Sequence, residues 1–293
     1  MSHLFHNKDS ISSRRLSSER GMALVELMAA MVIGAVLIVL VLQFFVGQSK
    51  SLIRSRDTAE MQQELRWAIN YVGDRLKLAG NGVPPTCGWP VVENTDGVDD
   101  PDSVSVLGSY KSLVMTTTQT MANEGSQVKV DDTDGLEIGD LCVISDGTWQ
   151  EIFLATDVKD MHIWHDEFPP WNDSMKLDHR YVEGSSLTVV TYYCFFVEVD
   201  EEGRSNLMVQ TQAYEPQILL GDVDDFQIRF QMKNNEWINE PRADELYDIR
   251  MIEIAIRARS HNEIKGYTDP EFGDSYQRLE VTSQIIPKNL TIL

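Results

Sequence analysis

Residues 27–46 read LMAAMVIGAVLIVLVLQFFV, and this run without a charged side chain decides the fold. At the helical rise per residue, a run of this length makes a helix about 30 Å long, which matches the hydrocarbon core of a bilayer. Thirteen of its twenty residues are Leu, Ile, Val or Phe, so transfer into lipid is favourable. The run therefore predicts a membrane-spanning helix rather than the core helix of a soluble protein.

A single carboxylate stands at the start of this run. Glu26 directly precedes it, and a carboxylate drawn into a bilayer costs up to about 3 kcal/mol, so Glu26 needs a headgroup position or a partner. Ahead of Glu26 lie Arg20, Gly21 and the four apolar residues 22–25. A short basic leader, a glycine, four apolar residues, a glutamate and then an uncharged run together resemble the type IV prepilin signature.

The resemblance implies a role for three residues. Gly21 is expected to be the last leader residue, because a side chain there obstructs the prepilin peptidase. Met22 becomes the N-terminus and is N-methylated, although the family usually has Phe at this place. Glu26 is expected to pair with the freed α-ammonium of a neighbouring subunit, a charge pair that gains strength in a low dielectric.

Composition limits the partners. The chain has 293 residues and a formal net charge of −21, and without the basic leader 1–21 it is near −23. So acidic a chain is unsuited to nucleic acid, which binds basic surfaces. Basic residues lie on both sides of the run, so their balance does not decide its orientation. The resemblance implies a single-pass protein of the bacterial inner membrane with an extracytoplasmic C-terminal domain.

The helical pattern continues beyond the uncharged run. Apolar residues recur every three or four positions, which predicts one buried face of an amphipathic helix. These residues are Met61, Leu65, Ile69, Val72, Leu76 and Ala79. Residues 80–85, Gly-Asn-Gly-Val-Pro-Pro, then end the helix. We expect one helix over residues 23–79, about 85 Å long.

Alternating apolar residues predict strands in the rest of the chain. The clearest strands are expected at residues 187–199, 226–231 and 251–259, and further ones at 103–107, 112–117, 141–145, 151–158 and 278–286. The fold class is therefore α+β, with a long N-terminal helix packed on an antiparallel, strand-rich domain. The expected divisions are a leader at 1–21, a transmembrane and assembly helix at 22–46, its amphipathic continuation at 47–82 and a globular domain at 83–293.

Several later stretches resemble the larger minor pilins called PilW-like. They include residues 136–141, 181–185, 224–226, 252–260 and 281–289. The resemblance implies a minor pilin that helps to initiate assembly of a type IV pilus and is incorporated into it. Its implied partners are the prepilin peptidase, other minor and major pilins, the pilus assembly machinery and the inner membrane.

Cysteines and histidines give two further expectations. Three cysteines allow at most one disulfide within the chain, either Cys142 with Cys194 or a bridge that includes Cys87. His162 and His165 form an HxxH, but a spacing of three places them on opposite faces of a strand, so ordinary loop histidines are expected. The Asp-rich residues 94–102 have oxygen ligands at the density of a calcium loop without completing an EF-hand.

No catalytic signature supports an enzyme. The chain has no G-x-S-x-G, HExxH or phosphate-binding glycine loop, and no metal or cofactor is expected. Two other functions remain open. A minor pseudopilin of a type II secretion system shares every N-terminal feature, whereas a membrane-tethered adhesin or ligand-binding domain predicts an uncut Gly21 and a replaceable Glu26.

Overall fold

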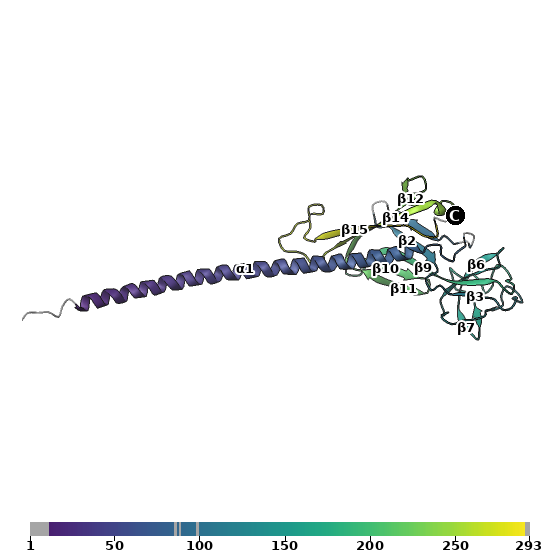
Figure 1. Cartoon of the computed structure of the whole chain (residues 1–293), viewed down its shortest axis with the longest axis horizontal. Coiled ribbons are helices and arrows are strands. Elements are labelled where there is room, and N and C mark those ends of the chain that lie inside the picture. Colours follow the sequence, from purple (N-terminus) through teal and green to yellow (C-terminus); the bar gives the residue numbers. More distant parts are fainter. Residues whose placement is uncertain (1–11, 85–86, 88, 98–99, 291–293) are drawn as a thin grey trace, which may run out of the picture. The chain divides into compact units, whose positions relative to one another are not determined.

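The computed structural model describes residues 12–84, 87, 89–97 and 100–290. The chain begins with one helix, α1 (Ser12–Lys77), followed by strands and one short 3-10 helix, η1 (Leu246–Asp248) (Figure 1). It divides into two units, Met1–Ala59 and Glu60–Leu293, and α1 contributes to both. The second unit holds the last turns of α1 and all the strands.

One face of α1 is buried within the second unit. The helix residues in the main hydrophobic core are Leu65, Ala68, Ile69, Val72 and Leu76. The spacing of Leu65, Ile69, Val72 and Leu76 predicted this face from the sequence, and the prediction is confirmed. The packing is close, because a Cβ at Gly73 would lie 3.0 Å from Cδ1 of Ile285 on strand β15 (Arg278–Ile285).

The predicted end of α1 is confirmed to within two residues. The helix ends at Lys77, and the amide of Gly80 then donates to the carbonyl of Leu107 at 2.9 Å. Gly80 and Gly82 have φ of 75° and 68°, a region that glycine adopts without strain. At Gly82 a Cβ would also lie 2.8 Å from the Thr188 side chain, so the turn needs glycine there.

Replacing Leu65 with alanine should destabilise the second unit substantially. Leu65 is fully buried, and a leucine-to-alanine change in a packed core costs about 2–5 kcal/mol. Denaturant unfolding of the full chain, followed by tryptophan fluorescence, should show a lower midpoint with an unchanged slope. Glu64→Ala, one residue earlier on an exposed position, is the matched control. Equal midpoints for the two variants would contradict this packing.

The larger sheet has eight strands and is organised around the long strand β9 (Ser186–Val199). The first half of β9 pairs with β3 and β5, and its second half pairs with β2 and β10, all antiparallel. The other strands of this sheet are β1 (Val92–Thr95), β2 (Ser103–Gly108), β3 (Val114–Thr116), β5 (Leu141–Ser145), β6 (Gln150–Leu154), β10 (Ser205–Thr211) and β11 (Tyr214–Leu220).

Strand β9 runs through two separate hydrophobic cores. Leu187 and Val189 belong to a second core, whose other members come from residues 115–181. Val190 and Phe195 belong to the main core, together with the buried face of α1 and the buried side chains of residues 223–258. The segment between β2 and β9 therefore contributes to both cores: it forms most of the second core, and Leu141, Ile152 and Leu154 on β5 and β6 also belong to the main core.

Two smaller sheets complete the fold. A four-stranded antiparallel sheet has the order β13-β12-β14-β15, and a three-stranded sheet has the order β4-β8-β7. Their remaining strands are β4 (Val128–Lys129), β7 (Asp157–Lys159), β8 (His162–Trp164), β12 (Val223–Met232), β13 (Trp237–Ile238) and β14 (Ile249–Arg259).

Asp102 joins the eight-stranded and the four-stranded sheets. It is 1% exposed, and its amide donates to the carbonyl of Phe226 on β12 at 2.7 Å. Its carboxylate accepts the amides of Gly97 at 3.0 Å and Ile228 at 2.7 Å. Burial raises the pKa of this carboxyl group above its ordinary value. The amide partners partly offset the cost of burial and hold the two sheets in register.

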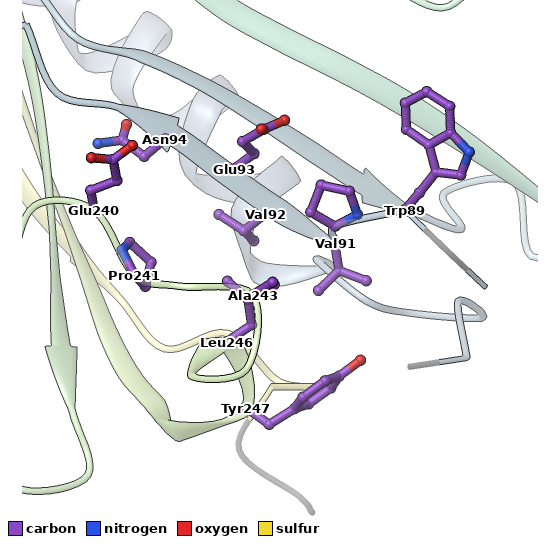
Figure 2. A pocket seen from close by; sticks show the side chains of 11 residues that line it. Trp89, Val91, Val92, Glu93, Asn94, Glu240, Pro241, Ala243, Leu246 and Tyr247 are labelled. Carbon is purple, nitrogen blue, oxygen red and sulfur yellow. The ribbon is translucent and has the colours of Figure 1, made fainter. Parts of the chain in front are cut away.

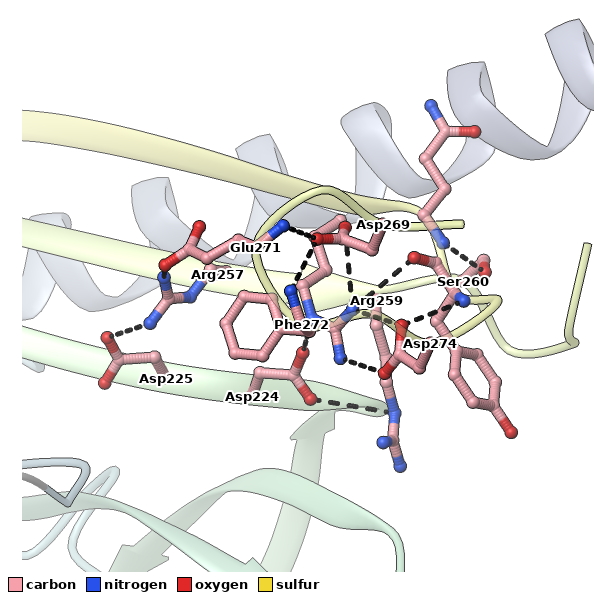
Figure 3. Close-up of polar contacts among 12 residues, drawn as sticks. Asp224, Asp225, Arg257, Arg259, Ser260, Asp269, Glu271, Phe272 and Asp274 are labelled. Atoms are coloured by element: carbon pink, nitrogen blue, oxygen red, sulfur yellow. Dashed lines mark hydrogen bonds and ion pairs between the residues drawn. The ribbon is translucent and has the colours of Figure 1, made fainter. Parts of the chain in front are cut away.

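A charged cluster fixes the loop between β14 and β15 (Figure 3). The Arg278 guanidinium is 9% exposed, and its Nε donates to Asp224 at 2.5 Å. Its two terminal nitrogens each donate to Asp274 at 2.7 Å, and Nη1 lies 3.6 Å from a carboxylate oxygen of Asp269. The same side chain lies over the Phe272 ring, with 3.9 Å between Cζ and the ring centroid. One buried arginine therefore holds β12 and the loop together.

Acid should weaken the second unit through Asp274. Hydrogen bonds from Arg278 lower the pKa of Asp274 to about 2, below its ordinary 3.8. Because the folded state holds the lower pKa, the stabilisation is present above about pH 4 and is lost as the pH falls towards 2. Urea midpoints of the full chain measured between pH 5 and pH 2 should fall, and Asp274→Asn should flatten that fall. Parallel curves for the two proteins would contradict the assignment.

The predicted α+β fold is confirmed, with a long N-terminal helix and antiparallel sheets. The strands expected at 187–199, 226–231 and 251–259 are β9, β12 and β14. The single strand expected at 151–158 is wrong, because β6 ends at Leu154 and β7 begins at Asp157. The chain changes its hydrogen-bonding partner between the two strands. The amide of Ala155 donates to the backbone carbonyl of Asp140, whereas the amide of Thr156 donates to the backbone carbonyl of Trp164.

Candidate assembly segment

The first half of α1 exposes apolar side chains on every side. In residues 24–46 all the large apolar side chains are exposed, from 52% for Val39 to 68% for Met31. The described residues contain one helix that is long and apolar enough to cross a membrane, and it includes this part of α1. A helix that is apolar all round requires an apolar environment, which is either lipid or other protein.

The character of α1 changes along its length. In residues 24–46 apolar residues surround the helix, residues 47–59 are mostly polar, and from Leu65 onward the apolar residues occupy one face that is buried in the main core. One continuous helix therefore carries an apolar segment that no other described residue covers and a second segment that belongs to the globular unit. The second segment anchors the first to a folded domain.

Glu26 is placed at the start of the apolar segment. Its side chain is exposed, and among the side chains that the structure describes its carboxylate has no hydrogen bond or ion pair. While the Glu26 carboxylate is exposed to water, its hydration makes a protein partner unnecessary. When the neighbouring apolar residues are covered, the carboxylate loses its hydration as well and then requires a cation.

The expected cleavage site lies on the same helix. Gly21 and Met22 are both within α1, and their backbone is helical. Glu26 is the fifth residue when Met22 is counted as the first, so it lies slightly more than one turn after Met22 on the helix. Cleavage between Gly21 and Met22 would place a new ammonium group close to the level of the Glu26 carboxylate.

The structure does not bring Cys142 and Cys194 together. All three cysteines are free thiols in this structure. Cys142 pairs in register with Val189, five residues before Cys194 on β9. Five residues along a strand span about 17 Å, far beyond the range of about 4–7 Å between the Cα atoms of a disulfide. Cys87 belongs to the main core and Cys142 to the second core.

The two histidines of the HxxH have separate partners. Nδ1 of His162 lies 2.7 Å from the carbonyl oxygen of Asp160, and Nε2 of His165 lies 3.0 Å from that of Ser126. In the Asp-rich segment 94–102, residues 98–99 lie outside the described residues. Asp102 in this segment binds backbone amides, as described above, which accounts for its burial without a metal ion.

The structure brings together two groups of residues that the sequence did not connect. Asp224 lies in one of the stretches that resemble the PilW-like minor pilins, and its partner Arg278 lies far along the chain. A groove between residues 89–94 and 240–247 was not predicted at all. Neither group has a local signal, because each forms only when distant strands pair.

Comparison with known proteins shows only limited similarity. No family model matches this chain, and no curated protein matches it. Among solved structures, a type IV-like pilin from Thermus thermophilus matches with a TM-score of 0.41 and 10% sequence identity, over 79% of this chain and 98% of that chain. A similarity at this level assigns neither a family nor a function.

Proposed function

We propose that this chain is a non-enzymatic subunit of a type IV pilus or a related filament. It is made as a membrane-inserted precursor and cut between Gly21 and Met22. The observation that carries the proposal is the first half of α1, a helix without a charge from residue 27 to residue 46, exposed all round, with one carboxylate at its start and a glycine five residues before that carboxylate.

The exposed apolar segment needs two successive environments in this proposal. Before assembly, the bilayer covers the side chains of residues 24–46, and the domain that follows lies outside the cytoplasm. During assembly, the same side chains pack against the corresponding helices of other subunits. Transfer from lipid to protein exchanges one apolar environment for another, so apolar burial alone gives little preference for the filament.

The charge pair supplies that preference. Cleavage frees the α-ammonium of Met22, and N-methylation keeps it cationic. Inside a helix bundle the Glu26 carboxylate of one subunit then meets the ammonium of its neighbour, where the low dielectric strengthens the attraction. The proposal therefore gives the cut after Gly21 a direct role in assembly, since the uncut chain has a neutral peptide bond at Met22 and no ammonium to pair with Glu26.

The finer proposal is a minor pilin of the PilW-like kind. Its support is the diffuse resemblance in residues 130–293 and the large globular unit after α1. In that role the chain helps to initiate pilus assembly together with other minor pilins, is recognised by the prepilin peptidase and the assembly machinery, and remains in the pilus. The globular unit then lies outside the inner membrane.

The test is the mass and the N-terminal sequence of the membrane-extracted protein, from cells with and without the prepilin peptidase. We expect a chain that begins at methylated Met22 only when the peptidase is present. The variant Gly21→Val, which adds a side chain at the cleavage site, should remain at the precursor mass in both strains. If the uncut precursor persists in both strains, the proposal is contradicted, and the membrane-tethered adhesin or ligand-binding domain is favoured instead.

A second measurement separates the two filament types. Chemical cross-linking of the full chain in intact cells, followed by identification of the joined subunits, should recover pilins of a type IV pilus. Recovery of subunits of a type II secretion system instead would assign the chain to the pseudopilins. Both outcomes keep the cut at Gly21, so this measurement addresses the partner set alone.

A further inference from the structure

A groove of about 420 Å³ lies between strand β1 and the loop of residues 240–247 (Figure 2). Its two walls are distant in the sequence and come from the eight-stranded sheet and from the loop that leads to β14. The Asn94 side-chain amide donates to the carbonyl of Asn239 at 2.8 Å, and the Asn239 amide donates to Asp96 at 3.0 Å. Side-chain bonds therefore hold the walls at one end and leave the rest of the groove open.

One wall of the groove is an unpaired strand edge. Strand β1 is the last strand on its side of the eight-stranded sheet and pairs only with β2. In an antiparallel strand, alternate residues direct their amide and carbonyl groups away from the paired neighbour. Within the described ranges, no hydrogen bond reaches the backbone of residues 92–95 from that outer side. An open edge of this kind accepts an extended chain as a further strand.

The groove offers negative charge without a partner. Glu93 on β1 and Glu240 on the opposite wall are both exposed, and neither carboxylate has a hydrogen bond or ion pair with a described residue. The net charge of −21 adds a field of the same sign. The exposed carboxylates of Glu93 and Glu240, which form the rim of the groove, therefore favour an occupant that carries lysine or arginine.

A buried hydrogen-bond acceptor and two aromatic rings also line the groove. Asn94 is 4% exposed, and its Oδ1 has no hydrogen-bond partner within the described part of the chain, so this wall of the groove contains one unsatisfied acceptor. At the other end lie Trp89 and Tyr247, and Trp89 is held in place by Trp171 with 4.4 Å between the ring centroids. The groove thus combines acidic, hydrogen-bonding and aromatic surfaces over a short length.

We propose that this groove binds an extended segment of a partner protein, which adds to β1 as a strand and presents alternating basic and apolar side chains. The backbone of the segment pairs with the open edge of β1. Its basic side chains lie beside Glu93 and Glu240, and its apolar side chains lie towards Trp89 and Tyr247. The groove is outside the apolar half of α1, so the inference stands whether or not the chain enters a filament.

The test uses the full chain in lipid nanodiscs and a display library of random linear dodecapeptides. We expect enrichment of peptides in which Lys or Arg alternates with apolar residues. A synthetic peptide of the enriched sequence should bind, and N-methylation of every second backbone amide should abolish binding, because strand pairing needs those N–H groups. Salt should weaken binding, because the rim charges are exposed.

Two groove variants have matched controls. Ala243→Trp fills the groove from an exposed loop position, and Glu93→Gln with Glu240→Gln removes its charge while keeping the side-chain shape. Each should weaken peptide binding at least tenfold. The controls are Ala122→Trp and the pair Glu201→Gln with Glu263→Gln, which change exposed positions outside the groove and should bind as the unchanged chain does.

Three results would overturn the proposal. The first is a library that enriches no peptide above the level found with Ala243→Trp. The second is an enriched peptide whose binding survives N-methylation or both groove variants, which would place it elsewhere on the molecule. The third is a glycan array on which an oligosaccharide binds the full chain and is lost in Ala243→Trp while no peptide binds, which would make the groove a sugar site.

Discussion

Replacing Glu26 with leucine is expected to leave the chain in the membrane and cut after Gly21, but to keep it out of filaments. Leucine suits the apolar segment better than glutamate does, so insertion is not impaired. The loss arises in the assembled state, where the Met22 ammonium of the neighbouring subunit would be buried without an anion. Removing one member of a buried charge pair costs about 2–5 kcal/mol, so incorporation should fall by at least about thirtyfold.

The measurement is the amount of the subunit in sheared and purified filaments, relative to the amount in the membrane fraction. Glu26→Gln should fail almost as completely as Glu26→Leu, because an amide keeps the size but not the charge. Glu64→Gln, an exposed glutamate on the globular part of α1, is the control and should be incorporated normally. Normal incorporation of Glu26→Leu would remove the charge pair from the proposed mechanism.

Replacing Arg278 with methionine should produce the largest loss of stability of any single substitution in the charged cluster. Methionine keeps much of the length of the side chain but leaves the carboxylates of Asp224, Asp269 and Asp274 facing one another around an apolar group. Removing a cation that three carboxylates share leaves them to repel one another, and solvent relieves part of that repulsion at Asp274, which is 36% exposed. The loop between β14 and β15 should detach first, since Arg278 is its main attachment to β12.

Denaturant unfolding and limited proteolysis of the full chain measure this effect. We expect a lower unfolding midpoint for Arg278→Met and new cleavage within residues 260–277. Arg278→Lys keeps the charge but cannot donate to both Asp224 and Asp274 in the same fork geometry, so it should restore only part of the loss. Arg242→Met is the control, because Arg242 forms an exposed pair with Glu245 and should change little. Equal midpoints for Arg278→Met and Arg242→Met would show that the cluster contributes nothing.

The elements with a strong period were predictable from the sequence. The spacing of Leu65, Ile69, Val72 and Leu76 carries a helical period, and burial enforces it, so both the helix and its buried face were predicted. The alternation in β9, β12 and β14 was equally clear. The edge strands β1 and β11 were missed, because β1 has only four residues and β11, which reads YEPQILL and is mostly exposed, has no apolar alternation.

The assembly segment and the groove beside β1 also differed in how far the sequence predicted them. The assembly segment is a linear motif, in which Gly21, Met22, Glu26 and the uncharged run follow one another, so the sequence contains all of it. The groove beside β1 is made of residues 89–94 and 240–247, whose proximity depends on strand order. Strand order also determines the distance between Cys142 and Cys194. Cys142 on β5 pairs with Val189 on β9, and Cys194 lies five residues further along β9.

The place where the second core joins the main frame has an evolutionary consequence. The chain leaves β2 at Gly108 and returns at Thr191, and these two residues are neighbours across the sheet. Because the entry and the exit are adjacent, the loops of the segment between them can be lengthened or shortened while its main-core residues, such as Leu141, Ile152 and Leu154, stay in place, and a longer loop adds only slowly to the entropic cost of closure. Selection can therefore diversify that face of the protein while the frame that presents the apolar helix stays constant.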